Sequence, residues 1–240
     1  MSTEQKEIPY ITLDNVTDSD VLNRYIYPNM SINYYWSDDF SPQMYIALAQ
    51  AGFISVTHNH EGRLLLLPEM QTHYAVLDYE NLRIGKRVAK LQRSSRYRLA
   101  FNTGFNEVLS SIQNAYEDCW ITGEYAELMK DLSQNSYENF ELFSTELYDE
   151  DNGTLIAGEI GYITHNVYTS LSGFHNPSKG YNNWGTLQLV LLAQHLEEQG
   201  VRFWNLGHPY MEYKADLGAK ILNRADFLEK WKNNTSNLLD

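Results

Sequence analysis

Three strand-like segments followed by one long apolar helix constrain the fold of this chain more than any other feature. The segments cover residues 140–148, 155–163 and 167–171. Each is rich in β-branched and aromatic residues, and turn residues such as Asp151-Asn152-Gly153 separate them, which predicts an antiparallel meander. Residues 184–199 then have helical periodicity, end at Gly200, and precede another strand at 203–206. This order predicts a mixed α/β sheet rather than a strictly alternating Rossmann domain.

The remaining segments extend this layout in both directions. Further helices are predicted at residues 84–91, 105–116, 122–132 and 225–231, with a strand at 97–101. A meander, a polar loop, a long helix and a strand form the layout of GNAT-type acyltransferases. The first 80 residues differ, with an irregular stretch to residue 40, a helix between Ser41 and Gly52, and short strands at 64–67 and 74–77. We therefore expect a small N-terminal α+β subdomain (1–80) and a GNAT-type domain (81–240), whose mixed sheet is flanked by helices.

Composition excludes several classes of protein. Hydrophobic residues make up 43% of the 240 residues, which is enough for a sizeable core and excludes wholesale disorder. Cys119 is the single cysteine, so an intramolecular disulfide framework and a cysteine-rich metal site are excluded. No apolar run is long enough to span a bilayer, and Met1–Glu7 lacks the hydrophobic region of a signal peptide. We expect a cytoplasmic protein with no membrane partner, no metal and no cofactor.

One basic segment stands out in a chain of net charge −13. Seven of the 18 Lys and Arg residues, and no acidic residue, lie between Arg83 and Arg98. The rest of the chain holds 11 basic and 31 acidic residues, which argues against a general DNA-binding protein. The segment is either a site for a phosphate backbone or a solvated helix face that offsets surrounding carboxylates.

A few polar residues are candidates for chemistry. Glu159 lies between small and apolar residues of a predicted strand, so it either faces water or needs a buried partner. His208 follows a strand and is either a general base or a turn residue. His58 and His60 have no third ligand nearby in the sequence, so we expect a loop there rather than a metal site. Cys119 is expected to be an inert thiol.

Several short motifs share their order and spacing with one known family. They are Asp39-Phe40-Ser41-Pro42, Leu82-Arg83-Ile84-Gly85-Lys86, Cys119-Trp120-Ile121-Thr122, Ser144-x-Glu146, Leu155-x-x-Gly158-x-x-Gly161 and Leu217-Gly218-Ala219. With these motifs, the chain from residue 38 onward resembles the leucyl/phenylalanyl-tRNA–protein transferases. That resemblance implies a GNAT-type fold and transfer of an amino acid from aminoacyl-tRNA to a protein or peptide N-terminus, as in the N-end rule of protein catabolism.

The resemblance also implies roles for individual residues. The basic helix would bind tRNA through Arg83, Lys86, Arg87, Lys90 and Arg93. Trp120 would stack on the terminal adenine, and Ser144 with Glu146 would bind the ribose or the α-amino group. Leu171, Ser172 and Phe174 would line the substrate site. Asn205 could donate a hydrogen bond to the oxyanion, and Glu159 or His208 would supply any catalytic base.

The chain departs from the family where the chemistry is expected. Leu171 replaces a carboxylate, Asn205-Leu206-Gly207 replaces Asp-Cys-Gln, and Glu159 replaces a methionine of the apolar amino-acid pocket. A carboxylate in that pocket predicts a basic or polar donor amino acid rather than Leu or Phe. Two other functions stay open at this point: an acyl-CoA-dependent N-acyltransferase of GNAT type, and a non-catalytic relative that binds tRNA or peptide.

Overall fold

The computed structural model describes residues 7–94 and 96–235, so Met1–Lys6 of the predicted polar N-terminus lie outside the described residues. The helices are α1 (Leu13–Thr17), α2 (Ser19–Val21), α3 (Pro42–Gln50), α4 (Lys86–Gln92), α5 (Phe105–Ala115), α6 (Gly123–Gln134), α7 (Trp184–Glu198), α8 (Glu212–Leu217) and α9 (Arg224–Thr235). The strands are β1 (Ile54–His60), β2 (Arg63–Glu69), β3 (His73–Leu77), β4 (Tyr97–Phe101), β5 (Phe140–Asp149), β6 (Leu155–Thr164), β7 (Val167–His175), β8 (Phe203–Gly207) and β9 (Lys220–Asn223).

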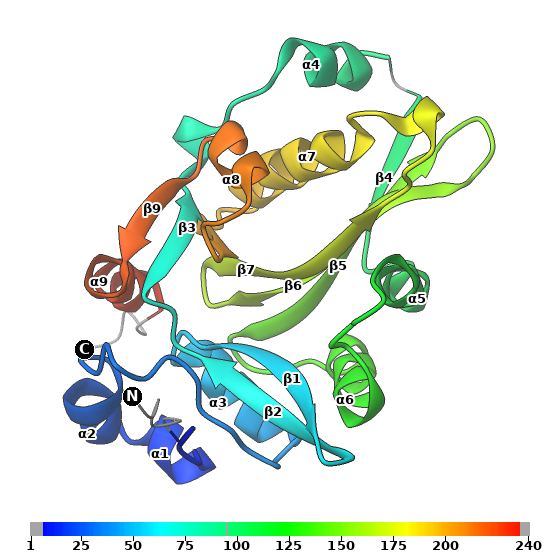
Figure 1. The fold of residues 1–240 in the computed structure, drawn as a ribbon. Helices are drawn as coiled ribbons and strands as arrows, with labels where there is room; N and C mark the ends of the chain where they lie inside the picture. Colours follow the sequence, from blue (N-terminus) through cyan, green and yellow to red (C-terminus); the bar gives the residue numbers. More distant parts are fainter. Residues whose placement is uncertain (1–6, 95, 236–240) are drawn as a thin grey trace, which may run out of the picture.

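A seven-stranded mixed sheet organises the molecule, in the order β4-β5-β6-β7-β8-β3-β9 (Figure 1). Strands β4 to β7 pair antiparallel, and β7 pairs parallel with β8. A parallel neighbour requires a crossover connection, and α7 provides it. The predicted meander, the long helix, the strand that follows it and the mixed sheet of a GNAT-type layout are therefore confirmed. The hairpin of β1 and β2 forms a separate two-stranded sheet.

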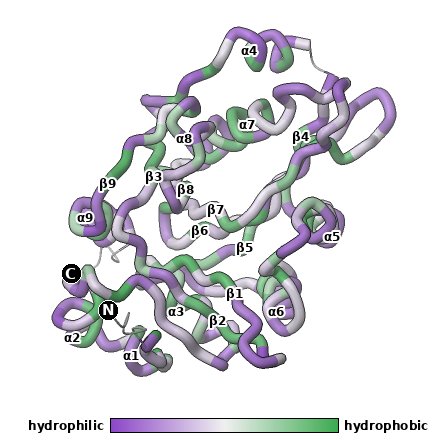
Figure 2. Tube along the Cα trace, viewed as in Figure 1, coloured by the Kyte–Doolittle hydropathy of each residue, from purple (hydrophilic) through white to green (hydrophobic). Residues whose placement is uncertain are grey.

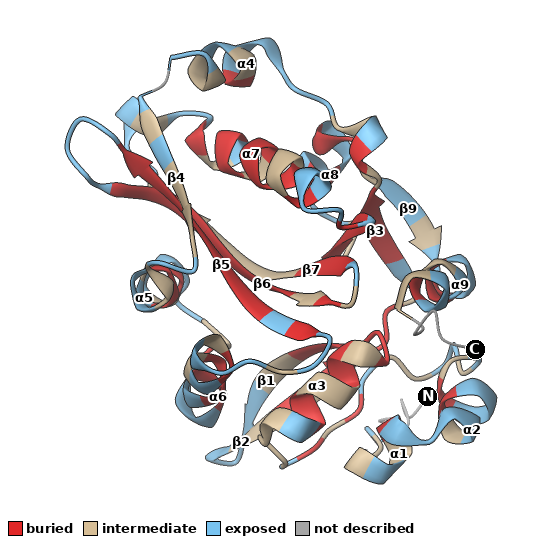
Figure 3. Ribbon diagram, turned by 180° about the vertical axis from the view of Figure 1, so that it is seen from behind, coloured by how far each residue is buried: buried red, intermediate tan, exposed pale blue. Residues whose placement is uncertain are grey.

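Helices cover both faces of the large sheet, and each face has its own core. On one face α7 buries Leu187, Val190 and Leu196 against the strands. On the other face α3, α5 and α6 pack with the β1–β2 hairpin. Figure 3 shows buried residues along β5 to β7 and α7, whereas α4 is largely exposed. In Figure 2 the loops after β1 and β5 are hydrophilic, in keeping with their exposure.

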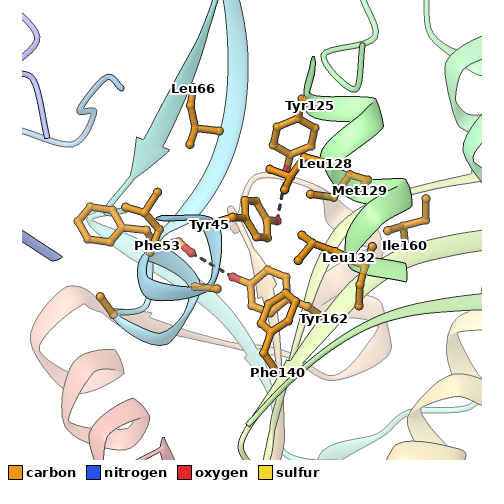
Figure 4. Packing of buried hydrophobic residues seen from close by; sticks show 14 of the residues in the cluster. Tyr45, Phe53, Leu66, Tyr125, Leu128, Met129, Leu132, Phe140, Ile160 and Tyr162 are labelled. Carbon is orange, nitrogen blue, oxygen red and sulfur yellow. Dashed lines mark hydrogen bonds between the residues drawn. The ribbon is translucent and has the colours of Figure 1, made fainter. Parts of the chain in front are cut away.

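Buried tyrosines join the N-terminal part of the chain to the large sheet (Figure 4). The Tyr162 hydroxyl of β6 donates to the main-chain oxygen of Phe53 at 3.0 Å. The Tyr125 hydroxyl of α6 donates to the main-chain oxygen of Ser55 at 3.0 Å and lies 3.1 Å from the Tyr45 hydroxyl. A buried hydroxyl that loses its partner costs about 1–3 kcal/mol, so these bonds fix how α3 and β1 sit on the sheet.

Two local predictions were wrong, and the position of strand β3 bears on a third, the domain boundary at residue 80, which stays a prediction. His58 and His60 lie in β1, not in a loop. Their intrinsic preference for strands is weak, and the backbone pairing with β2 outweighs it. Residues 13–26 form short helices, the first of them capped by the Thr12 side chain, where an irregular segment was expected. Strand β3 lies before the predicted boundary at residue 80, yet it pairs with β8 and β9 inside the large sheet. The predicted division at residue 80 is therefore not a division of the sheet.

Candidate active site

A cavity opens where two parallel strands separate. Strands β7 and β8 pair only from Val167–Thr169 to Phe203–Asn205, after which β7 continues to His175 without β8 beside it. The space between the second half of β7, the start of α7, and α8 is a cavity of about 870 Å³. This volume lies within the range of sites that bind ligands of drug or nucleoside size. The cavity is therefore the candidate active site.

Glu159 is the buried carboxylate of this cavity. Its side chain lies in the cavity wall, and the residue is only 5% exposed. The Oε1 atom accepts hydrogen bonds from the Tyr168 hydroxyl at 2.9 Å and the Ser170 hydroxyl at 2.7 Å, while Trp204 Nε1 donates to Ser170 Oγ at 2.6 Å. Within the described residues, Oε2 has no hydrogen-bond partner. Burial raises the pKa of Glu159 to about 7, so the carboxyl group can gain or lose a proton near neutral pH.

Two glycines of β6 give the cavity its shape. A Cβ atom on Gly161 would lie 2.3 Å from the Tyr168 hydroxyl, so only glycine leaves room for that hydroxyl to reach Glu159. A Cβ atom on Gly158 would lie 2.9 Å from the ring of Phe174, which lines the cavity. The glycines in Leu155-x-x-Gly158-x-x-Gly161 therefore position a hydrogen-bond donor and an aromatic ring.

Lys214 of α8 is a buried amine in the wall of the same cavity, and it was not among the predicted site residues. It is 6% exposed, and its Nζ atom donates to the main-chain oxygens of Leu206 at 2.5 Å and His208 at 2.7 Å. These two bonds leave one N–H of the ammonium group without a hydrogen-bond partner among the described residues, and the Tyr213 ring centroid lies 5.8 Å from Nζ. Burial lowers the pKa of Lys214 to about 8, although the negative charge of Glu159 opposes this shift.

The cavity brings together five of the predicted site residues: Glu159, Trp120, Leu171, Ser172 and Phe174. Trp120 is half-buried, its main-chain oxygen accepts a hydrogen bond from Thr57, and its ring packs edge-on against Tyr125 at 5.3 Å. The segment that carries Trp120 therefore has a fixed position at the cavity wall. Glu159 is buried and hydrogen-bonded, so of its two predicted positions the structure shows the inward one.

Three other predicted residues lie outside the cavity wall. Ser144 and Glu146 share a face of β5, as predicted, but both are fully buried and Ser144 Oγ donates to Glu146 Oε1 at 2.6 Å. Glu146 also accepts a hydrogen bond at 3.0 Å from the hydroxyl of Thr103, which is exposed. Asn205 is 1% exposed and bonds with Gly207 N and Thr169 Oγ1. The predicted contacts of these three residues with the ribose, the α-amino group and the oxyanion stay predictions.

His208 also lies outside the cavity wall, at the turn after β8. Its Nε2 atom is 2.9 Å from Oε2 of the buried Glu69, and its ring stacks on Tyr210. The His208 main-chain oxygen, rather than its ring, contacts the site by accepting the bond from Lys214. The structure therefore gives the His208 imidazole a carboxylate partner away from the cavity.

The basic segment forms α4 and the residues that flank it. All seven of its Lys and Arg residues are exposed, and no ion pair within the described residues involves Arg83, Lys86, Arg87, Lys90 or Arg93. A smaller hollow of about 360 Å³ lies between α4 and the start of α7, lined by Arg87, Lys90 and Arg96 among others. Asn183 lines both this hollow and the larger cavity. Arg96 pairs with Asp151 at 3.1 Å, whereas the five cations without an ion pair in the described residues are compatible with a polyanion site, which stays a prediction.

Membrane-spanning helices and clusters of metal ligands were also sought in the described part of the chain. None of its helices has the length and apolar character needed to cross a bilayer. In residues 7–94 and 96–235, no three His, Cys, Asp or Glu side chains gather as a metal site would require.

Comparison with known proteins identifies the family. The sequence model described as leucyl/phenylalanyl-tRNA protein transferase matches residues 76–232, which is more than half of the chain. The chain belongs to this family. It is 26% identical to the leucyl/phenylalanyl-tRNA–protein transferase of Colwellia psychrerythraea over 80% of the chain and 77% of the relative. The Pseudomonas putida enzyme of the same name is 24% identical, over 80% of each chain.

Solved structures include the crystal structure of FemX, which has 9% identity and a TM-score of 0.48 over 91% of this chain and 80% of that one. Membership of the leucyl/phenylalanyl-tRNA protein transferase family makes the chain a transferase. The matched range spans α4, the meander, α7 and α8, and so includes most of the cavity wall.

Proposed function

We propose that the protein transfers an aminoacyl group from aminoacyl-tRNA to the N-terminal amine of a protein or peptide. The observation that carries this proposal is the cavity at the β7–β8 separation, which holds a buried carboxylate and a buried amine and extends by way of Asn183 to an unpaired basic helix. Family membership supports the same activity, as does the order of motifs along the chain. A role in N-end rule protein catabolism follows if the acceptors are cellular proteins.

Different parts of the donor bind in the two hollows. Arg87, Lys90 and the other exposed cations of α4 neutralise phosphates of the tRNA. The terminal adenosine enters the larger cavity, where Trp120 and Phe174 offer aromatic surfaces, and stacking on such a ring contributes about 1–3 kcal/mol per base. The ester carbonyl is then placed near Glu159.

The chemistry requires little covalent work from the protein, because the ester is already activated. The attacking amine must be held against the carbonyl carbon, and the nitrogen must lose a proton as the new bond forms. Of the three predicted catalytic residues, only Glu159 lines the cavity, and within the described residues its Oε2 atom has no hydrogen-bond partner. We assign Glu159 the role of proton acceptor, for which a pKa of about 7 is well matched to neutral pH.

A transfer assay tests this proposal directly. The protein is incubated with a mixed pool of charged tRNAs and a peptide with a free N-terminus, and the products are read by mass spectrometry. A peptide extended by one residue, formed only with charged tRNA, is the expected result. Extension with acyl-CoA in place of tRNA would favour the N-acyltransferase, and binding of tRNA without turnover would identify a non-catalytic relative.

A further inference from the structure

We infer that Lys214 is the general acid of this transfer: its free N–H protonates the 3′ oxygen of the ribose as the ester bond breaks, and it acts as a pair with Glu159. This inference rests on the proposed function. Amino-acid transfer has two proton movements, one from the attacking nitrogen and one to the leaving oxygen. A single base could carry the proton from the nitrogen to the oxygen only if it reached both atoms, whereas a second group beside the leaving oxygen removes that requirement.

The position of Lys214 supports this role. Its Nζ atom is held by two main-chain carbonyls, Leu206 O and His208 O, so the amine cannot swing away from the cavity wall. The third N–H is the only one available to a ligand. These bonds also tie the end of β8 to α8. A long flexible side chain is thus converted into a fixed donor, which is what a catalytic acid requires.

The other charged and titratable groups around Lys214 are compatible with this assignment. Glu159 is the group whose charge acts most directly on the amine, and it favours the protonated form. The cavity is also lined by Tyr116, Glu117, Asp118, Cys119, His175 and Tyr213. Among the lining residues of this cavity, Lys214 is the one Lys or Arg, so it is the main cationic donor in the described wall.

The step balances in atoms and charge. The acceptor amine, as the free base, attacks the ester carbonyl carbon and forms the new C–N bond. Glu159 takes the excess proton from the nitrogen, the C–O bond to the ribose breaks, and Lys214 gives its proton to the 3′ oxygen. The proton on Glu159 then returns to the neutral Lys214 amine, and both groups regain their starting charges.

The test compares two donors that carry the same amino acid. In aminoacyl-tRNA the leaving ribose oxygen needs a proton, whereas a p-nitrophenyl ester releases a stable phenolate that does not. Lys214→Met is expected to slow single-turnover transfer from aminoacyl-tRNA about 10²–10⁴-fold, and to slow transfer from the p-nitrophenyl ester less than about 10-fold. Glu159→Gln is the matched control, because it removes the base and should slow both donors alike.

The pH profile gives a second readout. The wild-type rate with aminoacyl-tRNA should fall as pH rises through about 8, where Lys214 loses its proton, and this fall should be absent for the p-nitrophenyl ester. Equal losses with both donors in Lys214→Met would overturn the inference and leave Lys214 with a structural or purely electrostatic role. No loss with either donor would also overturn it. Failure of the wild-type protein to transfer from any charged tRNA would instead refute the proposed function.

Discussion

Replacing Glu159 with Gln is expected to change how the stability of the protein depends on pH. Burial raises the pKa of this carboxyl group from 4.5 to about 7. The folded protein therefore keeps the proton over a range in which the unfolded chain has lost it. The stabilisation is fully present below pH 4.5 and is lost as pH rises through about 7. The difference between the two pKa values corresponds to roughly 3 kcal/mol in the free energy of unfolding.

The glutamine side chain of this variant is uncharged at every pH, and its amide oxygen can still accept the bonds from Tyr168 and Ser170. In the wild type Lys214 has a pKa of about 8 and stays protonated in this range. Urea unfolding followed by tryptophan fluorescence measures the free energy of unfolding of both proteins. Between pH 4.5 and 7, wild type should lose about 3 kcal/mol relative to the variant. Parallel pH curves for the two proteins would refute the reasoning.

Three further predictions concern binding and specificity. Changing Lys86, Arg87 and Lys90 together to Ala should weaken tRNA binding and make its dependence on salt less steep, since fewer counterions are released; unchanged affinity and slope, measured by filter binding, would exclude α4 as the tRNA site. Trp120→Ala should weaken binding of a 3′-aminoacyl-adenosine analogue with little change in Tm, whereas a lower Tm without a binding defect would make the indole a core residue. In competition between charged tRNAs, arginyl- or lysyl-tRNA should outcompete leucyl- and phenylalanyl-tRNA; Glu159→Met also removes the proposed base and should lower every rate, but it should shift the ratio of products toward Leu and Phe, and a product ratio that favours Leu or Phe and is insensitive to the change would contradict the prediction.

The fold was predictable where the signal is local. The helix Trp184–Glu198 and the strands β5 to β7 have periodicities and turn residues that lie next to one another in the sequence. Helix α8 and strand β9 escaped prediction, because they have only six and four residues, too few to show a periodicity. Strand β1 ends in His-Asn-His, a pattern typical of loops, and only its pairing with β2 makes it a strand.

The candidate site was predictable in part. Glu159 was found because a carboxylate between glycines and apolar residues needs an explanation. Lys214 was missed, since a lysine in a polar helix normally lies in solvent and only the tertiary structure buries it. The hydrogen-bond partners of Glu159 were missed for a similar reason. The Tyr168 hydroxyl reaches Glu159 through the space that Gly161 leaves by having no side chain. That contact depends on the pairing of β6 with β7, which the sequence alone does not give.

The two hollows that share Asn183 have a consequence for how tightly donors of different length are held. A ligand anchored on α4 presents its other end to the larger cavity at a local concentration far above that in bulk solution. A weak contact on α4 and a weak contact in the cavity then add up to tight binding of the whole donor. A short donor that fills only the cavity would react by the same chemistry yet need much higher concentrations. A spent tRNA, having lost the contact of its amino acid, would dissociate readily.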